Sequence, residues 1–113
     1  MEIWFTQAER MRLLEAGAKA LDDESIIPIA RLFQPDGPGV WLVGELDPGN
    51  TGIAYGLADI GVGVPELGSF DLAELAMLRG ALNLSVERDL AFVPRATLAE
   101  LGRWATAAGR IVR

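Results

Sequence analysis

Three strand-like segments follow one another in the first half of the chain, with only short turns between them. They cover residues 28–34 (PIARLFQ), 40–46 (VWLVGEL) and 53–60 (IAYGLADI). The two links, PDGPG and DPGNTG, consist of residues that favour turns. A parallel pair of strands needs a crossover of about a dozen residues or more, so links this short predict antiparallel pairing.

Three expected helices accompany these strands, and each starts with a Thr or Asp three positions before a glutamate. This is the capping-box pattern, in which both side chains bond free backbone N–H groups at the start of a helix. The pairs are Thr6 and Glu9, Asp71 and Glu74, and Thr97 and Glu100. Apolar residues recur at helical spacing behind each pair. We expect the first helix to end at the acidic run 22–24 and the others at Gly80 and Gly109.

The order of these elements predicts the fold class. With a fourth strand expected within 86–93, the order is α-β-β-β-α-β-α. We therefore expect an α+β fold, a small antiparallel sheet of about four strands with helices packed on one face. Segment 61–68 (GVGVPELG) is interpreted as a glycine-rich loop. A chain of 113 residues, half of them hydrophobic, suits a single domain over residues 1–113.

Residue usage excludes several kinds of chemistry. The chain has no cysteine, which removes disulfides and thiolate metal sites, and no histidine, which removes serine–histidine and cysteine–histidine mechanisms. Lys19 is the only lysine and lies within an expected helix, outside any phosphate-binding motif. In GVGVPELG, Glu66 occupies the place of the third glycine of a dinucleotide-binding loop, and its carboxylate would repel a pyrophosphate. We expect no catalytic residue and no cofactor.

The turn DPGNTG offers two oxygen donors, Asp47 and Asn50, to a cation. A calcium loop needs more carboxylates at alternate positions and a bidentate glutamate at its end. We therefore expect no metal site and interpret Asp47 as the first residue of an Asx turn.

The net charge of −6 and the pI of about 4.5 disfavour contact with nucleic acid, because an acidic surface repels phosphates. Four arginines follow Pro94 against Glu100 alone, so this tail carries +3. Cations near the end of a terminal helix suit its dipole, which explains the tail without a nucleic-acid partner.

The first ten residues, MEIWFTQAER, contain no signal-peptide pattern, and no apolar run approaches the roughly 20 residues of a membrane span. We expect a cytoplasmic protein with no membrane contact. Nine of the ten cations are arginine, which suggests a GC-rich bacterial genome.

Arg88 is the most unusual residue of the chain. In LNLSVERDLAF (82–92) it shares the alternate positions with apolar residues, so a strand here would point its guanidinium toward the core. A buried guanidinium needs a carboxylate partner, for which we consider residues from other segments. The candidates are Glu45, Glu66 and Glu74. Glu87 and Asp89 would point to the opposite face.

Two alternatives for Arg88 stay open. Residues 85–89 could form a turn, in which case the alternation is accidental. Arg88 could also belong to an anion or substrate site, although structural ion pairs produce the same pattern. Glu45 and Asp47 share one strand face, where two carboxylates can do acid–base work, but exposed acidic pairs are ordinary in proteins.

Several segments together resemble an uncharacterised bacterial family, domain of unknown function 2958. They are RLFQPDGPGVWLVGELDP, IAYGLADIGVGVPELGSFDLAEL, RGALNLSVERDLAFVP and AAGRI, in this order from about residue 6 to 111. Asp71 stands where the family usually has Ser or Thr. The resemblance implies a small cytoplasmic protein of plasmids or other mobile elements, and it implies no activity or catalytic residue. Presence in the matching motifs nominates Trp41, Glu45, Asp47, Glu66 and Arg88 as binding residues.

Three functions are compatible with these observations. The first is a noncatalytic interaction or accessory protein of a mobile element, with an exposed apolar patch expected around Trp4, Phe5 or Trp41. The second is a small-molecule-binding domain or enzyme that uses a cleft of carboxylates and arginine, where four of the nominated residues would converge. These four are Glu45, Asp47, Glu66 and Arg88. The third is DNA mimicry, which 16 acidic residues diluted by ten basic ones support poorly. A protein partner and a homo-oligomer both stay open.

Overall fold

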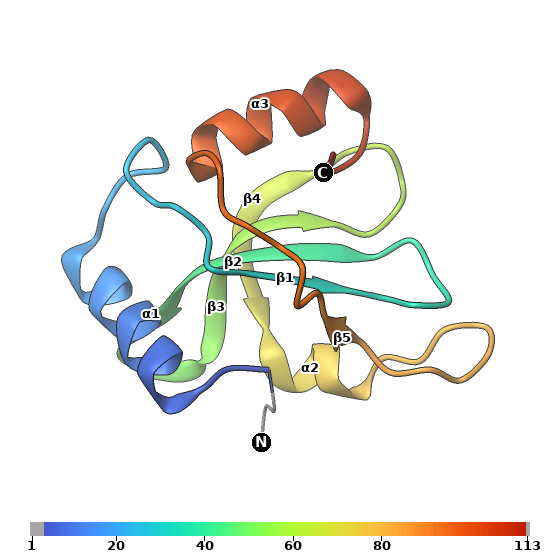
Figure 1. The fold of residues 1–113 in the computed structure, drawn as a ribbon, viewed down its shortest axis with the longest axis horizontal. Coiled ribbons are helices and arrows are strands. Elements are labelled where there is room, and N and C mark those ends of the chain that lie inside the picture. The colour runs from blue at the N-terminus through green and yellow to red at the C-terminus, as the bar shows by residue number, and fades with distance from the viewer. Residues whose placement is uncertain (1–3, 113) are drawn as a thin grey trace.

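The computed structural model describes residues 4–112, so that Arg113 of the basic tail lies outside it (Figure 1). Three helices and five strands follow one another in the expected order, with one additional strand. They are α1 (Gln7–Lys19), β1 (Ala30–Phe33), β2 (Val40–Asp47), β3 (Asn50–Asp59), β4 (Glu66–Asp71), α2 (Leu72–Met77), β5 (Glu87–Arg88) and α3 (Leu98–Ala108).

The strands form one antiparallel sheet in the order β4-β3-β2-β1-β5. The α+β class and the antiparallel pairing of the first three strands are confirmed. The interpretation of 61–68 as a loop is wrong in its second half, since β4 begins at Glu66. Its residues pair with β3, for example Leu67 opposite Leu57, and this tertiary pairing outweighs the weak strand preference of Gly68.

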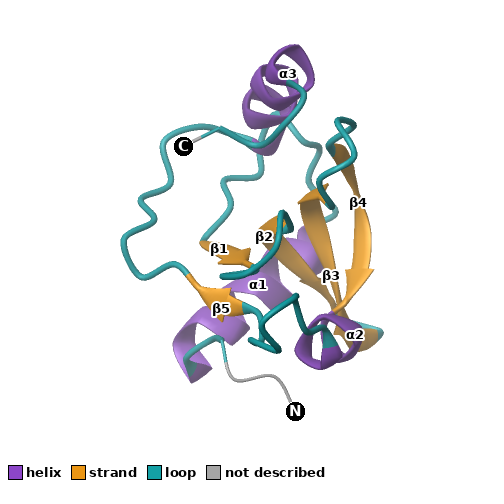
Figure 2. Ribbon diagram, turned by 90° about the vertical axis from the view of Figure 1, so that its right-hand side faces the viewer, coloured by secondary structure: helices purple, strands orange, loops and turns teal. Residues whose placement is uncertain are grey.

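The helices cover both faces of the sheet, where one face was expected. Trp41 and Val43 of β2 belong to a core cluster that includes Leu13 of α1. Leu42, between them, points to the opposite face and joins a second cluster with Leu98 of α3. In Figure 2, α3 lies above the sheet and α2 below it, whereas α1 is drawn behind the strands.

A bulge in β2 determines which side chains of this strand face α3. The register with β3 shifts between Val43 and Glu45, so that Glu45 lies opposite Tyr55. Gly44 is the residue at the bulge, and a Cβ there would lie 2.6 Å from Ile26 and 2.9 Å from Leu98. The close approach of these side chains therefore requires a glycine at position 44.

The helix starts are as the sequence predicts. Thr6 with Glu9 and Thr97 with Glu100 form reciprocal capping boxes, and Asp71 accepts bonds from two backbone N–H groups at the start of α2. Helix α1 ends at Lys19, before the acidic run 22–24, and α3 ends at Gly109, which has a left-handed φ of 73°. Helix α2 ends at Met77, earlier than expected.

Segment 82–92 is mostly a loop, so its alternation of apolar residues is accidental. Only Glu87–Arg88 pairs with β1 as β5, and Leu90 is 89% exposed. Asp36 holds the preceding turn, since its Oδ2 accepts hydrogen bonds from the backbone N–H of Leu82 (2.7 Å) and of Leu84 (3.1 Å). Across residues 4–112, no helix has the length and apolarity needed to cross a membrane.

Candidate functional site

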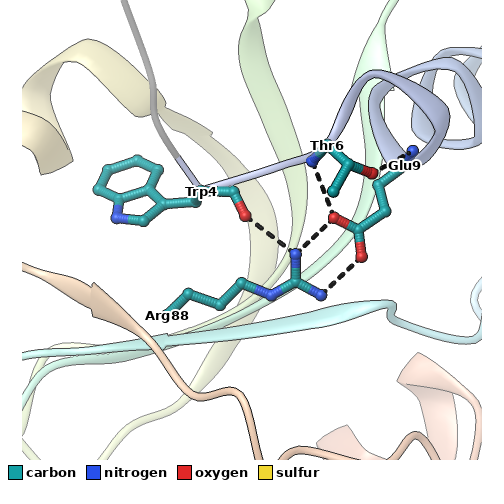
Figure 3. A network of polar contacts seen from close by, with 4 residues as sticks. All are labelled: Trp4, Thr6, Glu9 and Arg88. Carbon is teal, nitrogen blue, oxygen red and sulfur yellow. Dashed lines mark hydrogen bonds and ion pairs between the residues drawn. The ribbon is translucent and has the colours of Figure 1, made fainter.

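Arg88 is held in a structural ion pair (Figure 3). Its Nη1 and Nη2 donate to the two carboxylate oxygens of Glu9 at 2.5 and 2.8 Å, and Nη1 also donates to the carbonyl of Trp4 at 2.9 Å. The expectation of a carboxylate from a distant segment is confirmed, but the partners predicted, Glu45, Glu66 and Glu74, are wrong.

Glu9 has two roles at once, which is why its pairing was missed. Its Oε1 also accepts from the backbone N–H of Thr6 at 2.9 Å, completing the capping box of α1. The bond from Arg88 and then the bond from Thr6 lower the pKa of Glu9 to about 2. The carboxylate therefore stays ionised at neutral pH, and it joins the start of α1 to β5.

Both large aromatic residues proposed for an exposed patch are part of the core. Trp41 is 3% exposed, and Trp4 is also buried, with its indole Nε1 donating to the carbonyl of Val86 at 3.2 Å. Phe5 is half-buried and packs against the same cluster. Among the described residues 4–112, Trp4, Phe5 and Trp41 therefore do not form the exposed apolar patch that was expected around them.

Glu45 and Asp47 lie close together at the end of the β2–β3 hairpin, lining a depression of about 150 Å³ with Tyr55 and Ser69. The Oδ1 of Asp47 accepts from the backbone N–H of Gly49 at 2.8 Å, which confirms the Asx turn. Glu45 and Asp47 thus lie near each other, as their spacing of two residues predicts. The bulge at Gly44 shifts the register so that Glu45 lies opposite Tyr55.

Burial has an electrostatic consequence at Glu45 and Tyr55. Glu45 is half-buried beside Asp23, and burial first and this neighbouring charge second raise its pKa. The hydroxyl of Tyr55 donates to Oδ1 of Asp23 at 2.8 Å. Burial, this bond and the nearby carboxylates raise the pKa of Tyr55 to about 12. Within residues 4–112 no group of three potential acidic, histidine or cysteine ligands could hold a metal ion.

The four residues proposed to line one cleft do not converge. Glu66 lies opposite Ala58, whereas Glu45 lies opposite Tyr55, farther along the same strand β3. Arg88 is on β5 at the other edge of the sheet, with its terminal nitrogens bonded to Glu9. The polar residues nominated from the sequence therefore occupy three separate places.

A different surface combines features that suit recognition of another molecule. Strand β4 ends the sheet, and no strand of the described chain pairs with its outer edge (Figure 2). Its six residues, ELGSFD, include no fully buried one, no proline and no lysine. Its charged residues, Glu66 and Asp71, are confined to the two ends, so the central part of the strand lacks protective residues and can pair with a further strand.

An apolar groove of about 530 Å³ runs beside this edge, between β4 and α3. Leu57, Pro65 and Leu67 line its sheet side. The helix side is formed mostly by small residues, among them Gly102, where a Cβ would lie 3.4 Å from Leu67, together with Arg103, whose Nη1 donates to Glu24 at 2.7 Å. Because most of these side chains are small, they do not fill the space between α3 and β4, and the groove stays open.

The loop that leads into β4 adds exposed apolar side chains. Ile60, Val62 and Val64 are each at least 60% exposed, and Leu67 follows on the strand itself. We call the outer edge of β4, the adjoining groove and the loop 60–65 the β4 surface. The apolar residues Val62, Val64 and Leu67 are visible in the sequence, but the segment 61–68 that contains them was interpreted as a structural loop.

A family model described as "Protein of unknown function (DUF2958)" matches residues 4–112. This range covers nearly the whole chain and every element that forms the β4 surface. No curated protein and no solved structure matches the chain.

Proposed function

This chain belongs to the DUF2958 family of proteins of unknown function, and we propose that it is a noncatalytic interaction protein that binds an extended segment of a partner protein at the β4 surface. The observation that carries the proposal is the six-residue outer edge of β4, which no strand of the described residues covers. An extended peptide can add a strand to such an edge, with its main chain supplying affinity and its side chains filling adjacent pockets.

The groove beside β4 supports this mode of binding. In an added strand every second side chain points to the α3 face of the sheet. These side chains would enter the groove between Leu67 and Gly102, which is mainly apolar. The partner segment should therefore alternate apolar residues with other residues. Exposed loop residues such as Val62 (68% exposed) would extend the apolar contact beyond the strand.

The charges at the ends of β4 define the partner further. Glu66 begins the strand and Asp71 ends it, and the whole chain carries a net charge of −6. A segment with Lys or Arg near its ends would complement these carboxylates. In an antiparallel dimer centred between Gly68 and Ser69, Glu66 would face Asp71 of the second copy, and like charges directly opposite are destabilising. We therefore expect a different protein as partner rather than a second copy.

The cellular setting of the proposal comes from the family resemblance and from the composition. The resemblance to a family found on plasmids and other mobile elements suggests an accessory role there, and the arginine-rich composition suggests a bacterial host. We place the protein in the cytoplasm as a single-domain adaptor. Among the nominated binding residues, Glu66 contributes directly to this proposed interface.

A library of random linear peptides displayed on phage tests the proposal. Selection on the immobilised full chain should enrich sequences with alternating apolar residues flanked by Lys or Arg. A Leu67→Asp variant places a charge at the groove and should bind the selected peptides at least about tenfold more weakly, since burying an unpaired charge is costly. The exposed Glu15 on α1 provides the matched control, because Glu15→Lys changes the charge far from β4.

The proposal fails in either of two cases. The selection could enrich no common pattern, or the enriched peptides could bind Leu67→Asp as tightly as the unchanged chain. Far-ultraviolet circular dichroism of the variant shows whether it is folded. Gly68→Lys offers a second variant at the edge, because a Cβ at Gly68 has no atom within 4 Å and the change should not disturb the fold.

A further inference from the structure

A second cleft, distinct from the β4 surface, lies between α3 and the segment that joins β5 to α3, drawn orange in Figure 1. Its volume is about 280 Å³. This is near the lower end of the range of about 300–1,000 Å³ for small-molecule sites. Apolar side chains line most of the cleft: Leu42, Ala91, Phe92, Val93, Leu101, Trp104 and Val112. The cleft is therefore suited to a small ligand with an apolar body.

The polar group at the inner wall of this cleft is the guanidinium of Arg31. Arg31 is 9% exposed and lies on β1 opposite Leu42, on the face of the sheet that α3 covers. Its Nη1 donates to Oδ2 of Asp89 at 3.0 Å, and its Cζ lies 5.6 Å from the centroid of the Phe33 ring. Its Nε is buried and has no hydrogen-bond partner within the described chain.

The Nε of Arg88, the other partly buried arginine of the sheet, is also buried without a hydrogen-bond partner in the described chain, so Arg31 and Arg88 differ in the pairing of their terminal nitrogens. Both terminal nitrogens of Arg88 bond to the carboxylate of Glu9. Arg31 has a single bond to Asp89, whose Oδ1 is occupied by the backbone N–H of Ala91 at 2.9 Å. Asp89 therefore holds the guanidinium of Arg31 by one nitrogen, and other N–H groups of the guanidinium can still donate hydrogen bonds to a ligand in the cleft.

The charge of the lining defines the ligand. Arg31 and Arg95 contribute two positive charges and Asp89 one negative charge. The site is thus cationic by one charge, within a chain of net charge −6. A single carboxylate balances this charge, whereas a phosphate dianion would leave one negative charge uncompensated. Trp104, 48% exposed, offers an aromatic face at the rim.

We propose that this cleft binds a carboxylate attached to an apolar or aromatic group, with Arg31 bonding the carboxylate and Phe92, Leu101 and Trp104 enclosing the apolar part. The same chemistry occurs in free aromatic or branched-chain acids and at the C-terminus of a peptide that ends in an apolar residue. The inference goes beyond the proposed function, because none of these residues lines the β4 surface.

Binding can be followed on the full chain by two-dimensional NMR, through the indole N–H signal of Trp104 and, in every variant including Trp104→Ala, through the backbone amide signals of the residues that line the cleft. The probes are 3-phenylpropanoate and its neutral amide, together with a short peptide ending in phenylalanine, as free acid and as C-terminal amide. The free acids should bind at least about tenfold more tightly than the amides, because hydrogen bonds to charged groups are stronger than neutral ones.

Three variants locate the site. Trp104→Ala and Arg95→Gln alter exposed positions and should weaken binding of the acid severalfold. The pair Arg31→Gln with Asp89→Asn removes both buried charges together and should abolish the preference for the acid over the amide. Arg12→Gln, an exposed change on α1, is the control and should bind as the unchanged chain does.

Binding of the peptide acid would assign the site to chain ends, and binding of phenylpropanoate alone would assign it to small metabolites. Both results support the ligand chemistry. Equal affinity for acid and amide, absence of a Trp104 shift with every probe, or full affinity in Trp104→Ala would overturn the inference. A failure at the β4 surface would leave these outcomes unchanged, so the two proposals are tested separately.

Discussion

The ion pair between Glu9 and Arg88 should make a measurable, pH-dependent contribution to stability. Glu9→Gln removes the charge but keeps an amide that can still complete the capping box of α1. The pKa of Glu9 falls from 4.5 to about 2; at about 1.4 kcal/mol per pKa unit, this sets an upper bound of about 3 kcal/mol. The side chains of Glu9 and Arg88 are each 20% exposed. Solvent therefore screens the pair, and we expect a loss of about 2 kcal/mol in the free energy of unfolding.

The sign of the pH dependence follows from the direction of the pKa change. A carboxyl whose pKa is lower in the folded chain stabilises the fold above its unfolded pKa, and the contribution is lost as the pH falls toward the folded value. The difference between the unchanged chain and Glu9→Gln should thus be constant near neutral pH. It should shrink between about pH 5 and pH 2.

Urea unfolding followed by tryptophan fluorescence measures this difference, because Trp4 contacts the ion pair directly. Glu15→Gln, an exposed change on the same helix, serves as the control. A Glu9→Gln variant as stable as Glu15→Gln, or a loss of stability that is the same at about pH 3 and pH 7, would refute the reasoning.

Three further outcomes follow from the bulge in β2 and its neighbours. Gly44→Ala should destabilise the chain by about 1–3 kcal/mol through overpacking, as measured by urea unfolding. Tyr55 is the only tyrosine, so absorbance titration should give a single midpoint near 12, and Asp23→Asn should lower that midpoint. Because the pKa of Tyr55 is raised in the folded chain, its contribution to stability is present below the ordinary pKa of 10 and is lost as the pH rises toward 12. Glu45→Gln should raise stability at neutral pH, because it removes a carboxylate whose ionised form burial disfavours, and the gain should vanish in acid.

Local features of the fold could be predicted from the sequence because they depend on residues close together in the chain. The capping boxes at Thr6 and Thr97 are such features, since each needs only a hydroxyl and a glutamate three positions apart. The turn between β2 and β3 is another, with Asp47 bonding the N–H of Gly49. These interactions form in nearly the same way wherever the motif occurs.

Pairings between distant segments could be predicted only in part. The burial of Arg88 required a carboxylate, and this physical requirement held. Which carboxylate supplied it depended on the path of the N-terminal segment, which brings Glu9 across 79 positions of sequence to β5. No pattern in the sequence singled out Arg31 as a buried arginine. Its pairing with Asp89 was not predicted, because Asp89 was interpreted only as a neighbour of Arg88.

The β4 surface could not be predicted because an edge is a property of the whole sheet. The order of the strands leaves β4 at the end, and the sequence of β4 alone does not state this. The glycines just before the strand, Gly61 and Gly63, together with Gly68 within it, also favoured the interpretation as a loop. By contrast, β5 at the other edge comprises only Glu87–Arg88, which makes it too short for much further pairing.

Amide hydrogen exchange of the chain with and without a selected peptide tests the central claim most directly. If the peptide adds a strand to β4, alternate amides within residues 66–71 should become protected, together with the groove-lining turn of α3 around Gly102. The account is contradicted if the peptide binds while these amides exchange as fast as before.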